Sequence, residues 1–283
     1  MKKNMRTLPV YAVFALICAA VIFPVLIAVL LPFRGNDELR ATLDPLTGSD
    51  GSYSSFGIVA QYPTLDNFRE LLIFTPDFYK VFWNSVLIVV SILVFQLLVA
   101  IPSAWAFARF DFRGKKLLFD LYVIFMLVPF QVTMLSDHII LDRLGLLNTR
   151  LAVIIPAVFS TFPVFLIYRG FADIPRDIAD SARIDGANEW EVLRYIGLPL
   201  GRSGILSCVV ICFLDMWNMV EQPLAFIQDK ALYPLSIYLP MLDMGLGALM
   251  LAAAVITLIP AAFVFIIGQD HLEQGIIASA LKE

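Results

Sequence analysis

Four side chains that could bind a polar solute stand together in and just after an apolar run near residue 215. Asp215, Asn218 and Gln222 are three and four positions apart, a spacing that places side chains on one face of a helix. Polar groups in long apolar segments are costly to bury and are candidates for function. Trp217 lies among them, and such a group suits a sugar, which has an apolar ring face and many hydroxyls. We predict a candidate substrate pathway at Asp215, Trp217, Asn218 and Gln222, with simple helix packing as the alternative.

Residue patterns for catalysis or metal binding do not occur in the sequence. His138 and His271 have no neighbouring set of metal-ligand residue types. The apolar runs contain no paired carboxylates, and Asp215 has no evident catalytic partner. The Walker A pattern GxxxxGK[ST] is absent, so we do not expect this chain to bind ATP by that route. We expect no catalytic residue, no metal site and no cofactor bound by this chain.

The composition is typical of a membrane protein. Of 283 residues, 60% are hydrophobic and 16% are charged, whereas soluble domains are about half apolar and about a quarter charged. A helix that crosses a bilayer needs about 20 apolar residues, and several uncharged runs reach or approach this length. We therefore predict an all-α polytopic protein with one transmembrane domain over residues 1–283. Its six transmembrane helices are expected at about residues 8–33, 82–108, 117–136, 151–169, 203–221 and 244–268.

The distribution of Lys and Arg predicts the orientation of these spans. Six spans place both termini on one side, which would carry 13 of the 20 Lys and Arg residues against 7 on the other. Because basic residues are enriched in cytoplasmic loops, both termini and residues 173–200 are predicted to be cytoplasmic. Residues 34–80 then form a long outer loop, with a short helix expected in Leu65–Phe74. The run Thr7–Phe33 is too long for the apolar core of a signal peptide, so we predict a transmembrane helix there.

Residues 173–200, between the fourth and fifth predicted spans, form a charged segment with six acidic and three basic residues. Asp173 is expected to cap a helix that tolerates Pro175 in its first turn and runs to about Ile184. Gly186 then permits the left-handed backbone that helix ends often adopt. The segment is thus predicted to contain two short helices that meet at Gly186.

The second helix of this segment is predicted from a capping box. Asn188 and Glu191 have the required spacing, and the helix should stop before Leu198-Pro199, since the residue before proline disfavours the α conformation. Helices that lie in a membrane interface usually oppose Lys and Arg to large apolar groups, whereas the first helix here has acids and small side chains. We therefore favour docking into a groove of a partner protein, helped by the small residues Ala179, Ser181, Ala182 and Ala187.

Two short patterns in this segment occur at a spacing shared with a known family. The chain reads Asp180-Ser181-Ala182-Arg183-Ile184-Asp185-Gly186-Ala187 and then Ile196-Gly197-Leu198-Pro199. This resembles the EAA loop of bacterial ABC importer permeases, roughly Glu-Ala-Ala-x-x-Asp-Gly-Ala and then Ile-x-Leu-Pro, with Asp and Ser replacing the first Glu and Ala. In that family the loop forms the coupling helix that contacts the ATPase. The resemblance implies ATPase coupling by Asp180, Ser181, Ala182, Asp185, Gly186, Ala187, Ile196, Leu198 and Pro199.

Further stretches resemble the carbohydrate-importer branch of that family, on the maltose-permease side. They are Thr64–Phe68, Asn84-Ser85, Ala106–Arg109, Leu147–Thr149 and Trp217-Asn218. The resemblance implies a permease subunit of an ATP-driven, binding-protein-dependent importer of the bacterial inner membrane, with a sugar or oligosaccharide as substrate. Its implied partners are a second related permease, two ATP-binding cassette subunits that bind ATP and Mg²⁺, an extracytoplasmic solute-binding protein and the lipid bilayer, without nucleic acid.

Other transport functions remain alternatives. An ion- or proton-driven secondary transporter would need buried ionisable relays, for which only Asp215 and Asp120 qualify, and no inverted repeat is evident. An ABC importer permease for a polyol or glycerol phosphate would share the same sequence patterns. The partner permease is either a distinct chain, which the resemblance favours, or a second copy of this one.

Overall fold

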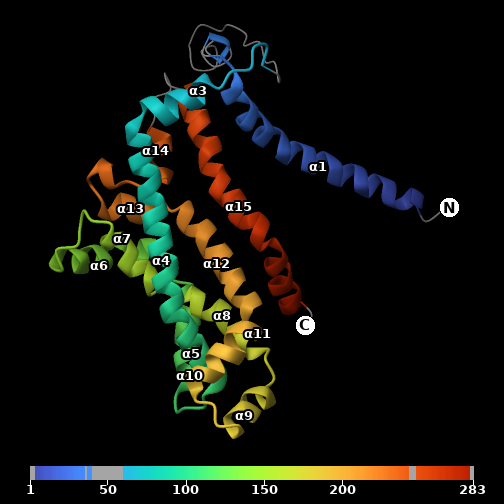
Figure 1. Cartoon of the computed structure of the whole chain (residues 1–283), viewed down its shortest axis with the longest axis vertical. Helices are drawn as coiled ribbons and strands as arrows, with labels where there is room; N and C mark the ends of the chain where they lie inside the picture. Colours follow the sequence, from blue (N-terminus) through green and yellow to red (C-terminus); the bar gives the residue numbers. More distant parts are fainter. Residues whose placement is uncertain (1–3, 36, 40–59, 242–246, 281–283) are drawn as a thin grey trace. The chain divides into compact units, whose positions relative to one another are not determined.

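The chain is helical, and the part that the structure describes contains no strand. The structure is a computed structural model that describes residues 4–35, 37–39, 60–241 and 247–280. Turns of 3₁₀ or π helix occupy Leu31–Phe33, Glu70–Phe74, Leu193–Gly197 and Lys230–Leu232. The α-helices are α1 (Asn4–Leu30), α3 (Asp66–Arg69), α4 (Pro76–Arg109), α5 (Lys115–Met126), α6 (Phe130–Arg143), α7 (Leu151–Val158), α8 (Phe162–Ala172), α9 (Arg176–Ile184), α10 (Glu189–Val192), α11 (Leu198–Leu200), α12 (Arg202–Trp217), α13 (Glu221–Phe226), α14 (Leu235–Met241) and α15 (Gly247–Ala280) (Figure 1).

The chain divides into two units, one formed by Met1–Tyr79 with Leu239–Ile259 and the other by Lys80–Tyr238 with Pro260–Glu283. In the first unit, the buried amide of Asn67 donates from Nδ2 to the carbonyl oxygens of Pro32 and Arg34, both at 2.7 Å. These two bonds join α3 to the chain that leaves α1. The short helix predicted in Leu65–Phe74 is observed as α3 and the π turn after it, while residues 40–59 of the predicted outer loop lie outside the described residues.

Among the residues that the structure describes, four stretches of helix are long and apolar enough to cross a membrane, and two bent helix pairs raise this number to six if each pair is one span. The four stretches correspond to the first, second, fourth and sixth predicted spans. Their bounds are Val10–Phe33, Pro76–Arg109, Leu151–Ala172 and Ala248–Asp270. The two bent pairs are Lys115–Met126 with Phe130–Arg143, at 98°, and Glu189–Leu200 with Arg202–Trp217, at 72°.

The third predicted span, residues 117–136, is not one straight helix. It breaks after Met126, and Pro129 has an extended backbone (φ −68°, ψ 147°) as the N-cap residue of α6. Proline lacks an N–H donor and disfavours the α conformation of the residue before it, so an uninterrupted helix through Val128 would be strained. The helix α6 therefore runs off at 98° from α5 and reaches Arg143, beyond the predicted end of the span.

In the second unit, α8 and α12 cross at two glycines. A Cβ added to Gly170 would lie 3.0 Å from the Cα atom of Gly204, so the two backbones are in direct contact. Close to this crossing, Phe171 packs edge-on against Trp105 of α4, with ring centroids 5.2 Å apart, and both side chains are buried. The ends of α4, α8 and α12 thus share one core, and this core supports the segment between α8 and α12.

Candidate functional site

The segment between α8 and α12 begins with α9, whose N-cap residue makes no side-chain capping hydrogen bond. Its N-cap residue is Pro175, whereas Asp173 is the C-cap residue of α8. The prediction that Asp173 is the N-cap residue of this helix is wrong, because the Asp173 backbone is still helical (φ −75°, ψ −14°) and its N–H bonds to the carbonyl of Arg169. The predicted end of the helix at Ile184 is confirmed.

Gly186 ends α9 in the left-handed conformation that the sequence predicted, with φ +92°. The N–H of Gly186 donates to the carbonyl of Arg183 at 3.1 Å, and the N–H of Ala187 donates to that of Ala182 at 3.0 Å. This pair of bonds is a Schellman motif, which satisfies the last carbonyls of the helix. The motif fixes the direction in which the chain leaves α9.

The capping box at Asn188 is confirmed. The N–H of Glu191 donates to Asn188 Oδ1 at 3.0 Å, and the N–H of Asn188 donates to Glu191 Oε2 at 2.8 Å. The second helix, however, does not stop before Leu198-Pro199. It continues through the π turn Leu193–Gly197 into α11, which contains Pro199.

The small residues of the segment face the chain itself. Ala179 is 1% exposed, and Ala182 and Ala187 are partly buried against the core that contains Val192 and Leu193. Ala179 therefore packs on the chain's own core and does not face a partner, contrary to expectation, whereas Ala182 and Ala187 keep part of their surface exposed. Small side chains are needed here because α9 lies directly on its own core. Ser181 does face outward, and its hydroxyl donates to the carbonyl of Asp177 at 2.8 Å.

Arg183 joins the two short helices across the Gly186 turn. Its Nε and Nη2 atoms donate to the two carboxylate oxygens of Glu189 at 2.7 and 3.2 Å, and its Nη1 atom donates to Asp180. The hydrogen bond to Glu189 raises the pKa of the Arg183 guanidinium; partial burial opposes this shift and Asp180 adds to it. The short Asp180 side chain is thus held on the surface of its own helix.

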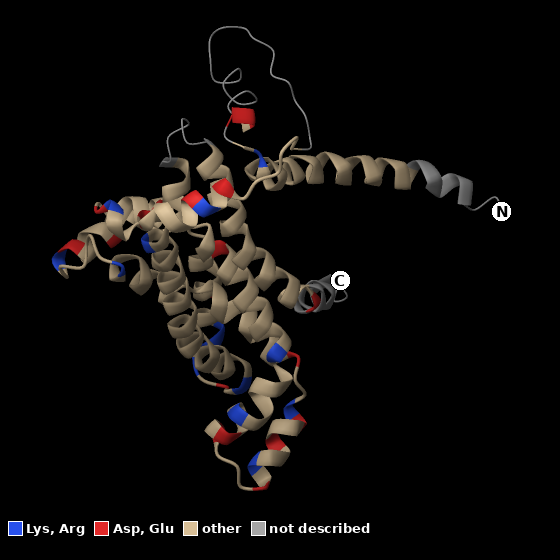
Figure 2. Ribbon diagram, turned by 45° about the horizontal axis from the view of Figure 1, so that its top comes forward, with Lys and Arg blue, Asp and Glu red and all other residues tan. Residues whose placement is uncertain are grey.

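The outward face of the segment combines apolar and acidic side chains. Ile184 is 86% exposed, Trp190 is 65% exposed and Ile178 is 42% exposed. The carboxylates of Asp177, Asp180 and Asp185 are exposed around them. Figure 2 shows charged residues gathered in the region of α9 and α10, whereas the long helices carry few. Ile196 and Leu198 pack against the core from the other side, and Pro199 is exposed.

Arg109, at the end of α4, anchors the start of this segment. Its Nη2 atom donates to the carbonyl oxygens of Phe171 at 3.1 Å and of Ile174 at 2.8 Å, and its guanidinium lies over the Trp105 ring, 5.2 Å from the centroid. Arg109 is only 9% exposed. Sequence reasoning did not assign this residue a role; the only signal was its place in the Ala106–Arg109 stretch.

A second link to the same segment runs through Asp111. This carboxylate accepts from Lys115 Nζ at 3.1 Å and from Arg176 Nη1 at 3.3 Å, and Arg176 is the first residue of α9. The hydrogen bond with Lys115, then the charges of Lys115 and Arg176, hold the pKa of Asp111 below its ordinary value. The end of α4 therefore holds the chain before α9 through the buried Arg109, and the loop after α4 contacts α9 itself through the exposed Asp111.

The residues of the candidate substrate pathway do not share one helix face. The helix α12 ends at Trp217, so Gln222 belongs to the separate helix α13, and only Asp215 and Asn218 keep the predicted relation. Trp217 is 4% exposed and stacks on Phe213, with ring centroids 5.4 Å apart and 14° between the planes. Its indole fills the core of the unit, as the packing alternative predicted. Asp215 and Asn218 are exposed, and Gln222 is partly buried.

Two asparagines that the sequence noted only as resemblances hold the chain between α13 and α14. Asn84 Nδ2 donates to the carbonyls of Ala231 and Tyr233, at 2.7 and 3.2 Å, and its Oδ1 accepts two bonds from Arg150, at 3.1 and 2.7 Å. Asn148, with φ 58°, accepts at Oδ1 from the N–H groups of Gln228 and Asp229, at 3.0 and 2.8 Å. These residues position the backbone between α13 and α14.

The fold and site together define an all-helical membrane protein in which two short helices, α9 and α10, lie between the crossing helices α8 and α12. The family model that describes the binding-protein-dependent transport system inner membrane component matches residues 82–278. The chain belongs to this family, whose members are transport components of the inner membrane, and it is a multi-pass inner-membrane protein.

Relatives and a solved structure agree with this assignment. The arabinooligosaccharides transport system permease protein AraQ of Halalkalibacterium halodurans is 31% identical over 95% of this chain and 94% of its own length. The lactose transport system permease protein LacG of Rhizobium radiobacter is 29% identical over 70% and 74%. The fold is similar to that of a chain in a bacterial ABC transporter involved in the import of the acidic polysaccharide alginate, with a TM-score of 0.82, 17% identity and coverage of 95% and 97%.

Proposed function

We propose that this chain is the permease subunit of an ATP-driven, binding-protein-dependent importer for a sugar or oligosaccharide, and that residues 173–200 couple it to the ATPase. The observation that carries the coupling role is the pair of exposed apolar side chains Ile184, at the end of α9, and Trp190, in α10. Arg183 joins these two helices through Glu189, and Arg109 holds the chain that leads into α9 at the carbonyl of Ile174. A segment that is held by several contacts can transmit a displacement of the ATPase to the membrane helices. A loosely held loop would change its own conformation instead. The named substrates of the relatives support a carbohydrate as the solute.

The proposal includes the assembly and the topology. Six spans, counting each bent pair as one, would form half of the pathway, with both termini and α9 in the cytoplasm by the distribution of Lys and Arg. A second, distinct permease would supply the other half. Two ATP-binding cassette subunits would bind ATP and Mg²⁺, while this chain remains non-catalytic, and a solute-binding protein would deliver the sugar from outside.

The coupling role is tested by Ile184→Glu in the full importer. Ile184 is almost fully exposed, so a charge there should leave the fold intact but oppose an apolar contact with the ATPase. We expect uptake of the solute to fall at least about tenfold, since burying an unpaired charge at an interface costs several kcal/mol, with normal amounts of protein in the membrane. Tyr62→Glu is the matched control, because Tyr62 is 82% exposed and lies far from α9 in the sequence.

Two outcomes would contradict the proposal. Equal uptake by Ile184→Glu, Tyr62→Glu and the unchanged protein would show that the tip of α9 makes no energetic contact. Uptake that survives depletion of ATP but collapses with an uncoupler would instead indicate a secondary transporter. The substrate class is tested separately, by competition of labelled sugar uptake with oligosaccharides, polyols and glycerol phosphate.

A further inference from the structure

A cavity of about 490 Å³ lies where α4 ends and α5 begins. Phe107, Phe119 and Tyr168 form one wall; Phe119 is 5.5 Å from Phe107 and 4.4 Å from Tyr168 between ring centroids. If α4, a candidate membrane span that ends at Arg109, crosses the bilayer, this cavity lies at the depth of lipid headgroups. Tyr and Trp side chains are enriched at that depth, and Tyr168 is one of them.

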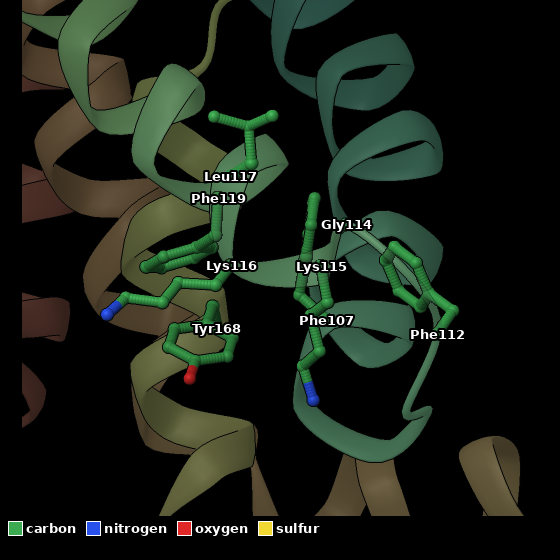
Figure 3. Close-up of a pocket in the computed structure, with 8 residues that line it drawn as sticks. All are labelled: Phe107, Phe112, Gly114, Lys115, Lys116, Leu117, Phe119 and Tyr168. Atoms are coloured by element: carbon green, nitrogen blue, oxygen red, sulfur yellow. The ribbon is translucent and has the colours of Figure 1, made fainter.

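The open side of the cavity carries positive charge and a hydroxyl. Lys115 and Lys116 both line it, and in the view of Figure 3 the hydroxyl of Tyr168 lies between their two amines. Lys115 is paired with Asp111 at 3.1 Å, whereas Lys116 is exposed and has no ion pair among the residues that the structure describes. The charge that a ligand would meet first is therefore that of Lys116.

An apolar stripe leads away from the cavity along α5. Leu117, which lines the cavity, is followed at four and seven positions by Leu121 and Ile124, so the three share one helix face. They are 66%, 37% and 55% exposed. A cationic rim that continues into an apolar stripe fits an amphipathic molecule, with an anionic head at the lysines and a hydrocarbon tail along α5. A free anion would make no use of the stripe.

We propose that this cavity binds the headgroup of an anionic phospholipid. The phosphate accepts hydrogen bonds from Lys116, Lys115 and Tyr168, and one acyl chain lies along Leu117 and Ile124. Basic pockets between transmembrane helices bind such headgroups by the same chemistry. The inference goes beyond the proposed transport function and does not rest on it, since it depends only on the membrane location of α4 and α5.

The test counts lipids bound to the purified full chain. The protein is delipidated in detergent, incubated with phosphatidylglycerol or phosphatidylcholine, and analysed by native mass spectrometry. We expect selective retention of phosphatidylglycerol and an affinity lowered about fivefold by Lys116→Gln, as each basic residue near a lipid surface contributes about this factor. Lys115→Gln should lower it less, because Asp111 already neutralises part of that charge. Leu117→Gln should weaken binding without changing the charge.

A double change elsewhere, Lys230→Gln with Arg143→Gln, is the control for general loss of charge. The proposal is overturned if this control lowers binding as much as Lys115→Gln with Lys116→Gln, or if phosphatidylcholine binds as well as phosphatidylglycerol. Displacement of the lipid by millimolar inorganic phosphate would identify a free-anion site instead. Unchanged lipid binding by Leu117→Gln would contradict the proposed contact between the acyl chain and α5. Thermal unfolding of each variant identifies any variant that fails to fold.

Discussion

Gly170 of α8 and Gly204 of α12 leave no room for a side chain between them, since a Cβ on Gly204 would lie 2.9 Å from the Cα atom of Gly170. The helices that enter and leave residues 173–200 are therefore in backbone contact. Small residues allow this close approach between helices in membranes. The base of the proposed coupling loop is set by this crossing, and a movement of the loop has to involve both helices.

The first prediction concerns this crossing. Gly204→Ala should force α8 and α12 apart and destabilise the protein by about 1–3 kcal/mol, as overpacking does. Thermal unfolding in detergent measures this effect. Gly35→Ala is the matched control, because no atom lies within 4 Å of a Cβ at that position. An equal midpoint temperature of unfolding for Gly204→Ala and Gly35→Ala would show that α8 and α12 can move apart without loss of stability.

The second prediction concerns Arg109. Replacing it by Ala removes two hydrogen bonds from a charged donor, worth about 1.5–3 kcal/mol each, and frees the carbonyls of Phe171 and Ile174. We expect faster hydrogen exchange in residues 173–186 and reduced uptake, with normal insertion into the membrane. Arg113→Ala is the control, since Arg113 is an exposed residue four positions further along the chain, in the loop after α4. Unaltered exchange in Arg109→Ala would contradict an anchoring role.

The third prediction concerns Gly186. An Ala at φ +92° would be strained by about 1 kcal/mol, although no atom lies within 4 Å of its Cβ. Gly186→Ala should therefore loosen the link between α9 and α10, and Gly186→Asn should do so less, because Asn tolerates the left-handed region better. The measurement is the rate of transport-coupled ATP hydrolysis, which should be highest in the unchanged protein, lower in Gly186→Asn and lowest in Gly186→Ala. An equal rate in Gly186→Ala and the unchanged protein would show that the left-handed backbone at this position is not needed.

The fourth prediction concerns the pH dependence of the Asp111 contacts. The pKa of Asp111 is lowered in the folded protein, so its ionised form favours the fold. This contribution is complete above the ordinary carboxyl pKa of 3.8 and is lost as the pH falls through the lowered value. Stability should therefore fall less steeply in acid for Asp111→Asn than for the unchanged protein. A steeper fall in the variant would contradict the assigned sign.

Local patterns predicted the local features of the proposed coupling segment. The end of α9 at Ile184, the left-handed Gly186 and the Asn188 capping box all depend on a few neighbouring residues, and all three are confirmed. The predicted Asp173 cap and the stop before Pro199 failed. In both cases packing on the core around Trp105 and Phe171 extends helical backbone beyond the boundary that local rules set.

The sequence did not predict whether a given side chain faces the core or the surface. The alanines of α9 read as a surface for a partner, yet they lie on the chain's own core, and the exposed positions are Ile184 and Trp190. Trp217 likewise read as a solute contact and is buried against Phe213. Small and aromatic residues are equally suited to packing in a core and to contacting a partner or a solute. Only the residues that surround them in the folded protein decide which of the two roles they have.

The sequence by itself determined that this is a helical membrane protein and, through the pattern from Asp180 to Pro199, that it resembles the permease family to which it belongs. Those properties follow from composition, from helix length and from contiguous residues. The tertiary structure alone decided that Arg109 holds Ile174, 65 positions away, and that Gly170 meets Gly204. Such contacts depend on how helices cross, and the separation of two residues in the sequence carries no information about that crossing.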